Sequence, residues 1–123
     1  SIFKKGYHKT IDNYLDKLKL YNESLKKIAE RIESFFEGSV KVNINELDKE
    51  GHYLSLTKTR FSLIQDKFNE SFVEIEGQNY FFKDFHIKKL TSQVKISGSI
   101  IDEISNNIIL IRQKLVSLTK ELF

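Results

Sequence analysis

The sequence contains no cysteine, proline, methionine or tryptophan among its 123 residues. Without cysteine the chain has no disulfide and no thiolate metal site, and a reducing compartment is favoured. No apolar run approaches the roughly 20 residues that a membrane-spanning helix needs, and residues 1–6 lack the apolar core of a signal peptide. We therefore expect no membrane partner. Because methionine is absent and an apolar helical pattern still runs at "KELF", we expect the chain to be a segment of something longer.

The residues that are present indicate one folded domain with a modest core. Hydrophobic residues make up 40% of the chain and charged residues 30%, which argues against a disordered chain. The net charge of +3 comes from 20 basic and 17 acidic residues. This bias is too weak to establish nucleic-acid binding by itself, so the positions of the charges matter more than their sum.

Both ends of the chain have the apolar spacing of long amphipathic helices. Steps of three and four residues alternate in each set, which is the heptad pattern of helices that pack along a narrow stripe. Thr10 is the expected N-cap of the first helix and Gly38 its C-terminal stop, over about 26 residues or roughly 39 Å. The first set is Ile11, Tyr14, Leu18, Tyr21, Leu25, Ile28, Ile32 and Phe35, and the second is Ile101, Ile104, Ile108, Ile111, Leu115, Leu118 and Leu122.

The segment between the two helices has the alternation of β-strands. "VKVNINEL" and "GHYLSLTKT" alternate apolar and polar residues, with a turn at "DKEG" between them, and "SFVEIEGQNYFF" alternates on both sides of a turn at "EGQN". These patterns predict three or four short antiparallel strands. "FSLIQDKF" fits a short helix or an extended connection, and the pattern does not decide between them.

These parts predict an α+β fold, an antiparallel two-helix coiled-coil stalk with a small antiparallel β-rich head inserted between the helices. Matching stripes on two long helices should pack on each other. The predicted boundaries are residues 1–38 for the first helix, 39–99 for the inserted head and 100–123 for the return helix.

The sequence offers no catalytic site. His8, His52 and His86 have no cysteine, histidine or paired carboxylate at ligand spacing, so no metal site is expected. The phosphate-binding, dinucleotide-binding, zinc-protease and serine-hydrolase motifs are all missing. A free-standing enzyme is therefore the least favoured class.

Basic and hydroxyl-bearing residues gather in two places in the middle segment. Residues 83–95, "KDFHIKKLTSQVK", contain four lysines against one aspartate, and "TKTR" adds Lys58 and Arg60. Lysine, arginine, threonine, serine and glutamine side chains all bond phosphate oxygens. A head that presents both segments would suit phosphates without reading a sequence, although ordinary solubilising surface also carries such lysines.

The order of these parts resembles the lever and clamp region of the MutS family of DNA mismatch repair proteins. "GYHKTIDNY" is similar to the family's "GYNxxLDxL", and "GHYLSLTK" at 51–58 is similar to "GYYIxVTK". "KKLTSQVK" at 88–95 corresponds to the family's "RQTLKN" run but matches it only at Lys89 and Thr91, and "NESFVEIEGQNYFF" is longer than in typical members. The similarity covers essentially the whole chain in the family's order.

The resemblance implies a clamp that grips the backbone of double-stranded DNA and contains no catalytic residue. It implies ATP, magnesium, a DNA-dependent ATPase activity and a second subunit only for the longer parent protein, and mismatch reading in other domains. A helical-hairpin module that binds a protein, with no nucleic-acid role, remains the alternative. The implied DNA-backbone contacts are Lys58, Arg60, Lys88, Lys89, Thr91, Ser92, Gln93 and Lys95.

Overall fold

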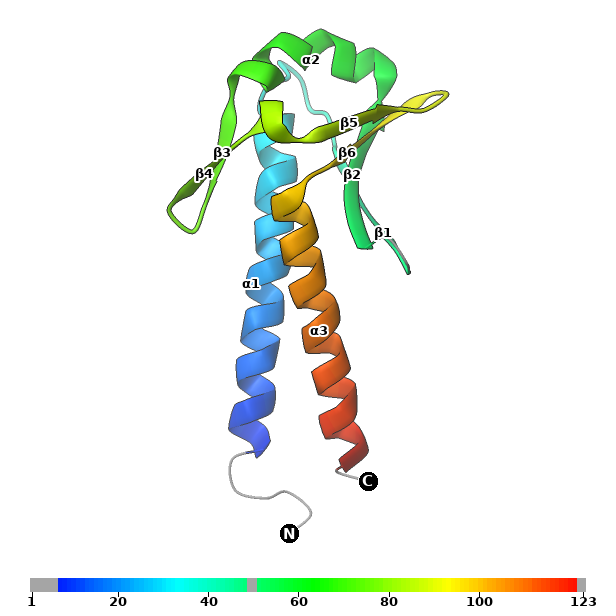
Figure 1. Cartoon of the computed structure of the whole chain (residues 1–123). Helices are drawn as coiled ribbons and strands as arrows, with labels where there is room; N and C mark the ends of the chain where they lie inside the picture. Colours follow the sequence, from blue (N-terminus) through cyan, green and yellow to red (C-terminus); the bar gives the residue numbers. More distant parts are fainter. Residues whose placement is uncertain (1–6, 49–50, 122–123) are drawn as a thin grey trace.

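The computed structural model describes residues 7–48 and 51–121, which form an α+β fold (Figure 1). The helices are α1 (Tyr7–Glu33), α2 (Lys58–Glu70) and α3 (Ser99–Glu121), with a 3₁₀ turn η1 (Phe82–Asp84). The strands are β1 (Asn43–Leu47), β2 (Gly51–Thr57), β3 (Phe72–Ile75), β4 (Gln78–Phe81), β5 (His86–Lys89) and β6 (Gln93–Ser97). Within this part of the chain no helix is both long and apolar enough to cross a membrane.

The strands form two separate antiparallel units. Four strands pair in the order β1-β2-β6-β5, while β3 and β4 form a two-stranded hairpin of their own. The β3–β4 hairpin turns at Glu76 and Gly77, whose φ angles of 53° and 80° suit the tight turn that joins two antiparallel strands. The predicted turn at "EGQN" is therefore confirmed. The predicted strand at "GHYLSLTKT" is confirmed as far as Thr57, whereas Lys58 and Thr59 begin α2.

The helix α2 settles the segment that the sequence left open. Thr57 caps its start, because its hydroxyl oxygen accepts a hydrogen bond from the backbone N–H of Arg60 at 3.2 Å. Phe61, Ile64 and Phe68 fall on one face of the helix and are buried. The backbone N–H of Ser71 then donates to the carbonyl of Phe68 and closes the last turn.

The predicted architecture, a two-helix coiled-coil stalk carrying a β-rich head, is wrong. The described residues contain three helices, and α1 and α3 bury their stripes in the core that they share with the sheet. Both long helices run side by side in opposite directions (Figure 1), but α3 also packs on β2, and α1 on β1 and β3. Where α1 extends beyond the sheet, its apolar stripe is only half-buried, at Ile11, Tyr14, Leu18 and Tyr21.

The predicted ends of the first helix are also wrong. Thr10 lies inside α1, which already includes Tyr7, and α1 ends at Glu33, before Gly38. The chain leaves the helix through two tighter bonds, from Phe35 N–H to Ile32 O and from Phe36 N–H to Glu33 O. Leu122 of the second predicted set, and Lys49 and Glu50 of the predicted "DKEG" turn, lie outside the described residues.

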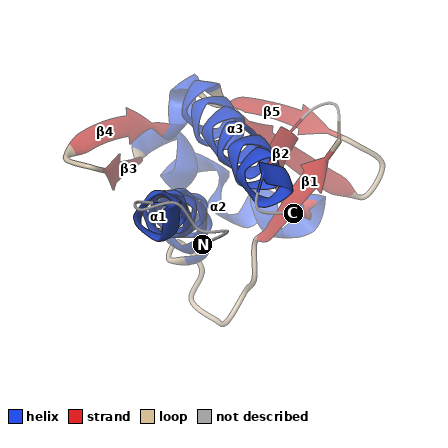
Figure 2. Cartoon of the chain, turned by 90° about the horizontal axis from the view of Figure 1, so that it is seen from below, coloured by secondary structure: helices blue, strands red, loops and turns tan. Residues whose placement is uncertain are grey.

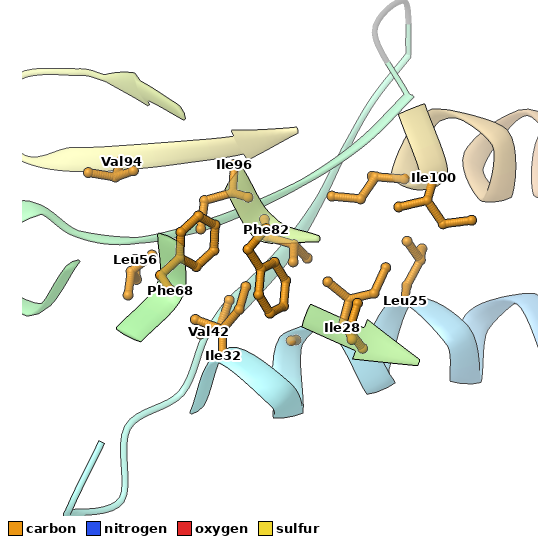
Figure 3. Packing of buried hydrophobic residues seen from close by; sticks show 14 of the residues in the cluster. Leu25, Ile28, Ile32, Val42, Leu56, Phe68, Phe82, Val94, Ile96 and Ile100 are labelled. Atoms are coloured by element: carbon orange, nitrogen blue, oxygen red, sulfur yellow. The ribbon is translucent and has the colours of Figure 1, made fainter. Parts of the chain in front are cut away.

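The core is built around stacked phenylalanines where the helices meet the sheet (Figure 3). The ring of Phe82 stacks on Phe68 with centroids 4.7 Å apart, and meets Phe35 and Phe85 edge to face. Phe82, in η1, therefore joins α2 to the turn that follows α1. Burying each such ring stabilises the fold by about 1.5–3 kcal/mol.

Candidate nucleic-acid interface

The helices cover one face of the four-stranded sheet and leave the other face open. Buried Leu54, Leu56, Val94 and Ile96 point toward the helices, and Figure 2 shows the strands of this sheet to one side of α3. Because successive side chains of a strand point to opposite faces, the intervening residues form the other side. We call this set the open face: Asn43, Asn45, Leu47, Tyr53, Ser55, Thr57, His86, Lys88, Gln93, Lys95 and Ser97.

The open face has no acidic residue at these strand positions. Its acidic neighbour on β1, Glu46, is paired with His52 and points to the helix side. A chain with 17 acidic residues thus places only neutral and basic side chains at these strand positions. That distribution favours an anionic partner.

Two lysines lie directly opposite each other on the open face. Lys88 of β5 pairs with Lys95 of β6, and Ser55 of β2 continues the same row. Opposed residues of antiparallel strands have β-carbons roughly 4.5–5.5 Å apart, and like charges there destabilise the sheet. This placement would let one anion contact both ammonium groups.

Tyr53 and Asn45 order the surface beside the lysines. The ammonium nitrogen of Lys95 lies 4.6 Å from the centroid of the Tyr53 ring, a cation–π contact. The amide nitrogen of Asn45 donates to the hydroxyl of Ser55 at 2.8 Å. These contacts hold Lys95 and the row around Ser55 in defined positions.

The turn between β5 and β6 lies against the start of α2. The backbone N–H of Lys58 donates to the carbonyl of Ser92 at 3.1 Å, and Leu90 N–H donates to Gln93 O at 2.8 Å. This places Thr91 and Ser92 beside the first turn of α2, where Lys58 and Arg60 are exposed. Phosphate oxygens would meet basic and hydroxyl-bearing side chains together at this end of the sheet.

The structure thus brings the predicted contact residues to one end of one sheet, although not to one face. Lys88, Gln93 and Lys95 belong to the open face. Lys89 pairs with Val94, which is buried on the helix side, so Lys89 points away from Lys88.

Sequence reasoning missed the neutral part of this surface. Asn43, Asn45, Tyr53, Ser55 and His86 were not among the candidates. The alternation of Val94 and Ile96 with polar residues would have revealed β6, and with it the face that these residues share.

A serine, a histidine and a glutamate also meet, on the helix side of the sheet. The Ser105 hydroxyl oxygen accepts the backbone N–H of His52 at 2.9 Å and lies 2.7 Å from its ring Nδ1. The ring Nε2 lies 3.5 Å from Glu46 Oε1, which also binds Arg112. Ser105 is only 2% exposed and His52 6%, so the group is closed to a substrate and acts as a tie between α3 and the β1–β2 hairpin.

Burial affects the pKa of His52 in this group. Desolvation lowers the pKa of His52 below 6.5, the nearby Glu46 carboxylate opposes that shift and Arg112 adds to it. The neutral ring with its proton on Nε2 suits both contacts, since Ser105 then donates to Nδ1. No group of three or more metal-ligating side chains occurs in the part of the chain that the structure describes.

Comparison of the sequence with protein-family models and with curated proteins gives no match. Membership of the MutS family therefore stays a proposal.

Proposed function

We propose that this chain binds the phosphate backbone of double-stranded DNA through the open face and the adjoining end of the sheet. The observation that carries the proposal is the Lys88–Lys95 pair on a face without acidic strand positions. The resemblance to the MutS family supports duplex DNA as the polyanion. The resemblance implies that ATP, magnesium and a second subunit would belong to the longer protein of which this chain would be a segment.

The predicted binding mode is independent of base sequence. Lysine, serine, threonine and asparagine side chains on a sheet reach phosphate and sugar oxygens, and these contacts position a duplex without reading it. Such binding releases counterions, so the logarithm of the affinity should fall with the logarithm of salt concentration by about 0.9 per phosphate neutralised.

The experiment measures the affinity of the purified chain for fluorescent duplexes across a salt series beginning at low ionic strength. Two unrelated duplex sequences of equal length should bind with equal affinity. Lys88→Glu should weaken binding and flatten the salt slope by about one phosphate contact. Lys19→Glu makes the same charge change on an exposed position of α1 and should have a much smaller effect.

Equal losses for Lys88→Glu and Lys19→Glu would show that only net charge matters and would overturn the assigned surface. Wild-type affinity that does not change with salt would overturn phosphate binding altogether.

A further inference from the structure

A cavity of about 260 Å³ lies between α1, α3 and the β3–β4 hairpin. None of the open-face residues lines it. Side chains from three separate parts of the chain converge on it. Its lining consists of Leu20, Tyr21, Ser24, Ile75, Glu76, Tyr80, Ile100, Glu103, Ile104 and Asn107.

Part of the lining is apolar, and the two hydroxyl groups beside it already donate hydrogen bonds within the chain. Ile75, Ile100 and Ile104 are buried, and the hydroxyl of Ser24 donates within its own helix to Leu20 O at 3.0 Å. The hydroxyl of Tyr80 donates to the Gln78 side chain at 2.8 Å. The Ser24 and Tyr80 hydroxyl protons are therefore already used, and the three isoleucines offer a guest an apolar surface.

The rest of the lining selects a positive charge. Glu76 at the hairpin turn and Glu103 on α3 contribute exposed carboxylates, and the half-buried rings of Tyr21 and Tyr80 face the same space. Among the residues that the structure describes, no lysine or arginine lines the cavity. Tyrosine rings attract organic cations, and carboxylates at a mouth that stays in water do so without a burial cost.

We propose that this cavity receives the side chain of a lysine or arginine presented by a partner protein. The volume lies below the roughly 300–1,000 Å³ of sites for drug-sized ligands or cofactors, which favours a single side chain over a nucleotide. The aliphatic stem of the guest would lie on the isoleucines while its charged end stays near Glu76 and Glu103. This site is independent of the proposed DNA surface.

The probe is a short fluorescent peptide with one central lysine, compared with the same peptide carrying arginine, norleucine or glutamate there. The lysine and arginine peptides should bind roughly tenfold more tightly than the norleucine peptide, and the glutamate peptide should bind least. Equal binding of lysine and norleucine peptides would overturn the cation site and leave only an apolar cavity.

Two substitutions test the carboxylates. Glu103→Gln keeps the shape of the side chain, and Glu76→Asn keeps a residue that tolerates the left-handed backbone at φ 53°. Together they should remove the preference for lysine over norleucine. Glu23→Gln, on an exposed position of α1 outside the cavity, should leave the preference intact.

If the double variant retains the full preference while its thermal unfolding matches that of the wild type, the proposal is wrong. Lys88→Glu should weaken DNA binding and keep peptide binding, so failure of one assignment is visible apart from failure of the other.

Discussion

Gly51 and Ser105 approach so closely that a β-carbon on Gly51 would overlap the hydroxyl oxygen of Ser105. Gly51 also has a positive φ of 77°, which L side chains adopt only with strain. The glycine that opens "GHYLSLTK" therefore lets the start of β2 reach α3, where His52 and Ser105 make their two hydrogen bonds.

Gly51→Ala should destabilise the fold by about 2–4 kcal/mol, from the strained φ and the steric overlap together. Chemical denaturation measures the change. Ser105→Ala alone should cost about 1–3 kcal/mol, because it leaves buried polar groups of His52 unpaired. In the double variant the overlap is relieved, so its loss of folding free energy should be smaller than the sum of the losses in the two single variants. Strict additivity would show that the overlap is not the cause.

Stability should fall with pH below about 6.5, the ordinary pKa of His52. Burial lowers the folded-state pKa of this histidine, so between that value and 6.5 the unfolded chain binds more protons than the folded one. Stability is therefore full above 6.5, falls as the pH drops toward the folded pKa and levels off below it. Urea denaturation between about pH 7.5 and about pH 5 measures this dependence.

His52→Gln should remove the component of that pH dependence that His52 contributes. His86→Gln, on the open face, should leave this component unchanged. An unchanged profile in His52→Gln would contradict the assignment.

Phe82→Ala should cost about 3–5 kcal/mol of folding free energy. The ring is 1% exposed and contacts Phe35, Phe68 and Phe85, so its removal leaves a cavity where three parts of the chain meet. Phe81→Ala is the matched control, since Phe81 is 47% exposed. Denaturation midpoints should separate the two variants clearly. Similar losses would mean that the core is not centred on Phe82.

Thr57→Ala should destabilise the chain by about 1 kcal/mol through loss of the N-cap of α2. Thr59 lies two residues further on in the first helical turn and is exposed, and Thr59→Ala should change stability much less. Thermal unfolding of both variants checks the cap. A larger effect at Thr59 would place the start of the helix elsewhere.

Lys88→Glu should weaken DNA binding more than Lys89→Glu. The two lysines are adjacent in sequence and both exposed, but they point to opposite sides of β5. The same duplex titration at fixed salt compares them, with equal changes in net charge. If Lys89→Glu is the more damaging, the duplex meets the other side of the hairpin and the open face is not the interface.

The long helices and β2 could be predicted because a repeat of apolar residues fixes which side of an element is buried. The repeat does not say what covers that side. Ile28 and Ile104 are heptad positions as predicted, yet both lie in a core shared with strands, so a pattern typical of a coiled coil arose here from helix–sheet packing. The pattern left helix α2 undecided; Leu63, 75% exposed, is an apolar residue that lies away from the buried face of Phe61, Ile64 and Phe68.

Less of the candidate site could be predicted, because its geometry depends on strand register. The abundance of lysine in residues 83–95 was visible, but the pairing of Lys88 with Lys95 depends on a turn closed by backbone bonds of Leu90 and Gln93. Reading that segment only as a charged run concealed the β5–β6 hairpin. The separation of Lys88 from Lys89 follows once the hairpin is known.

The pairing of β2 with β6 in the middle of the sheet has a consequence for how the chain folds. Hairpins β1–β2, β3–β4 and β5–β6 each join neighbours in sequence, whereas β2 meets β6 only after α2 and a whole hairpin have been laid down between them. Closing so long a loop costs entropy before any contact repays it. We expect the joining of these two strands to be the rate-limiting event, so that Leu54→Ala should slow folding more than it accelerates unfolding.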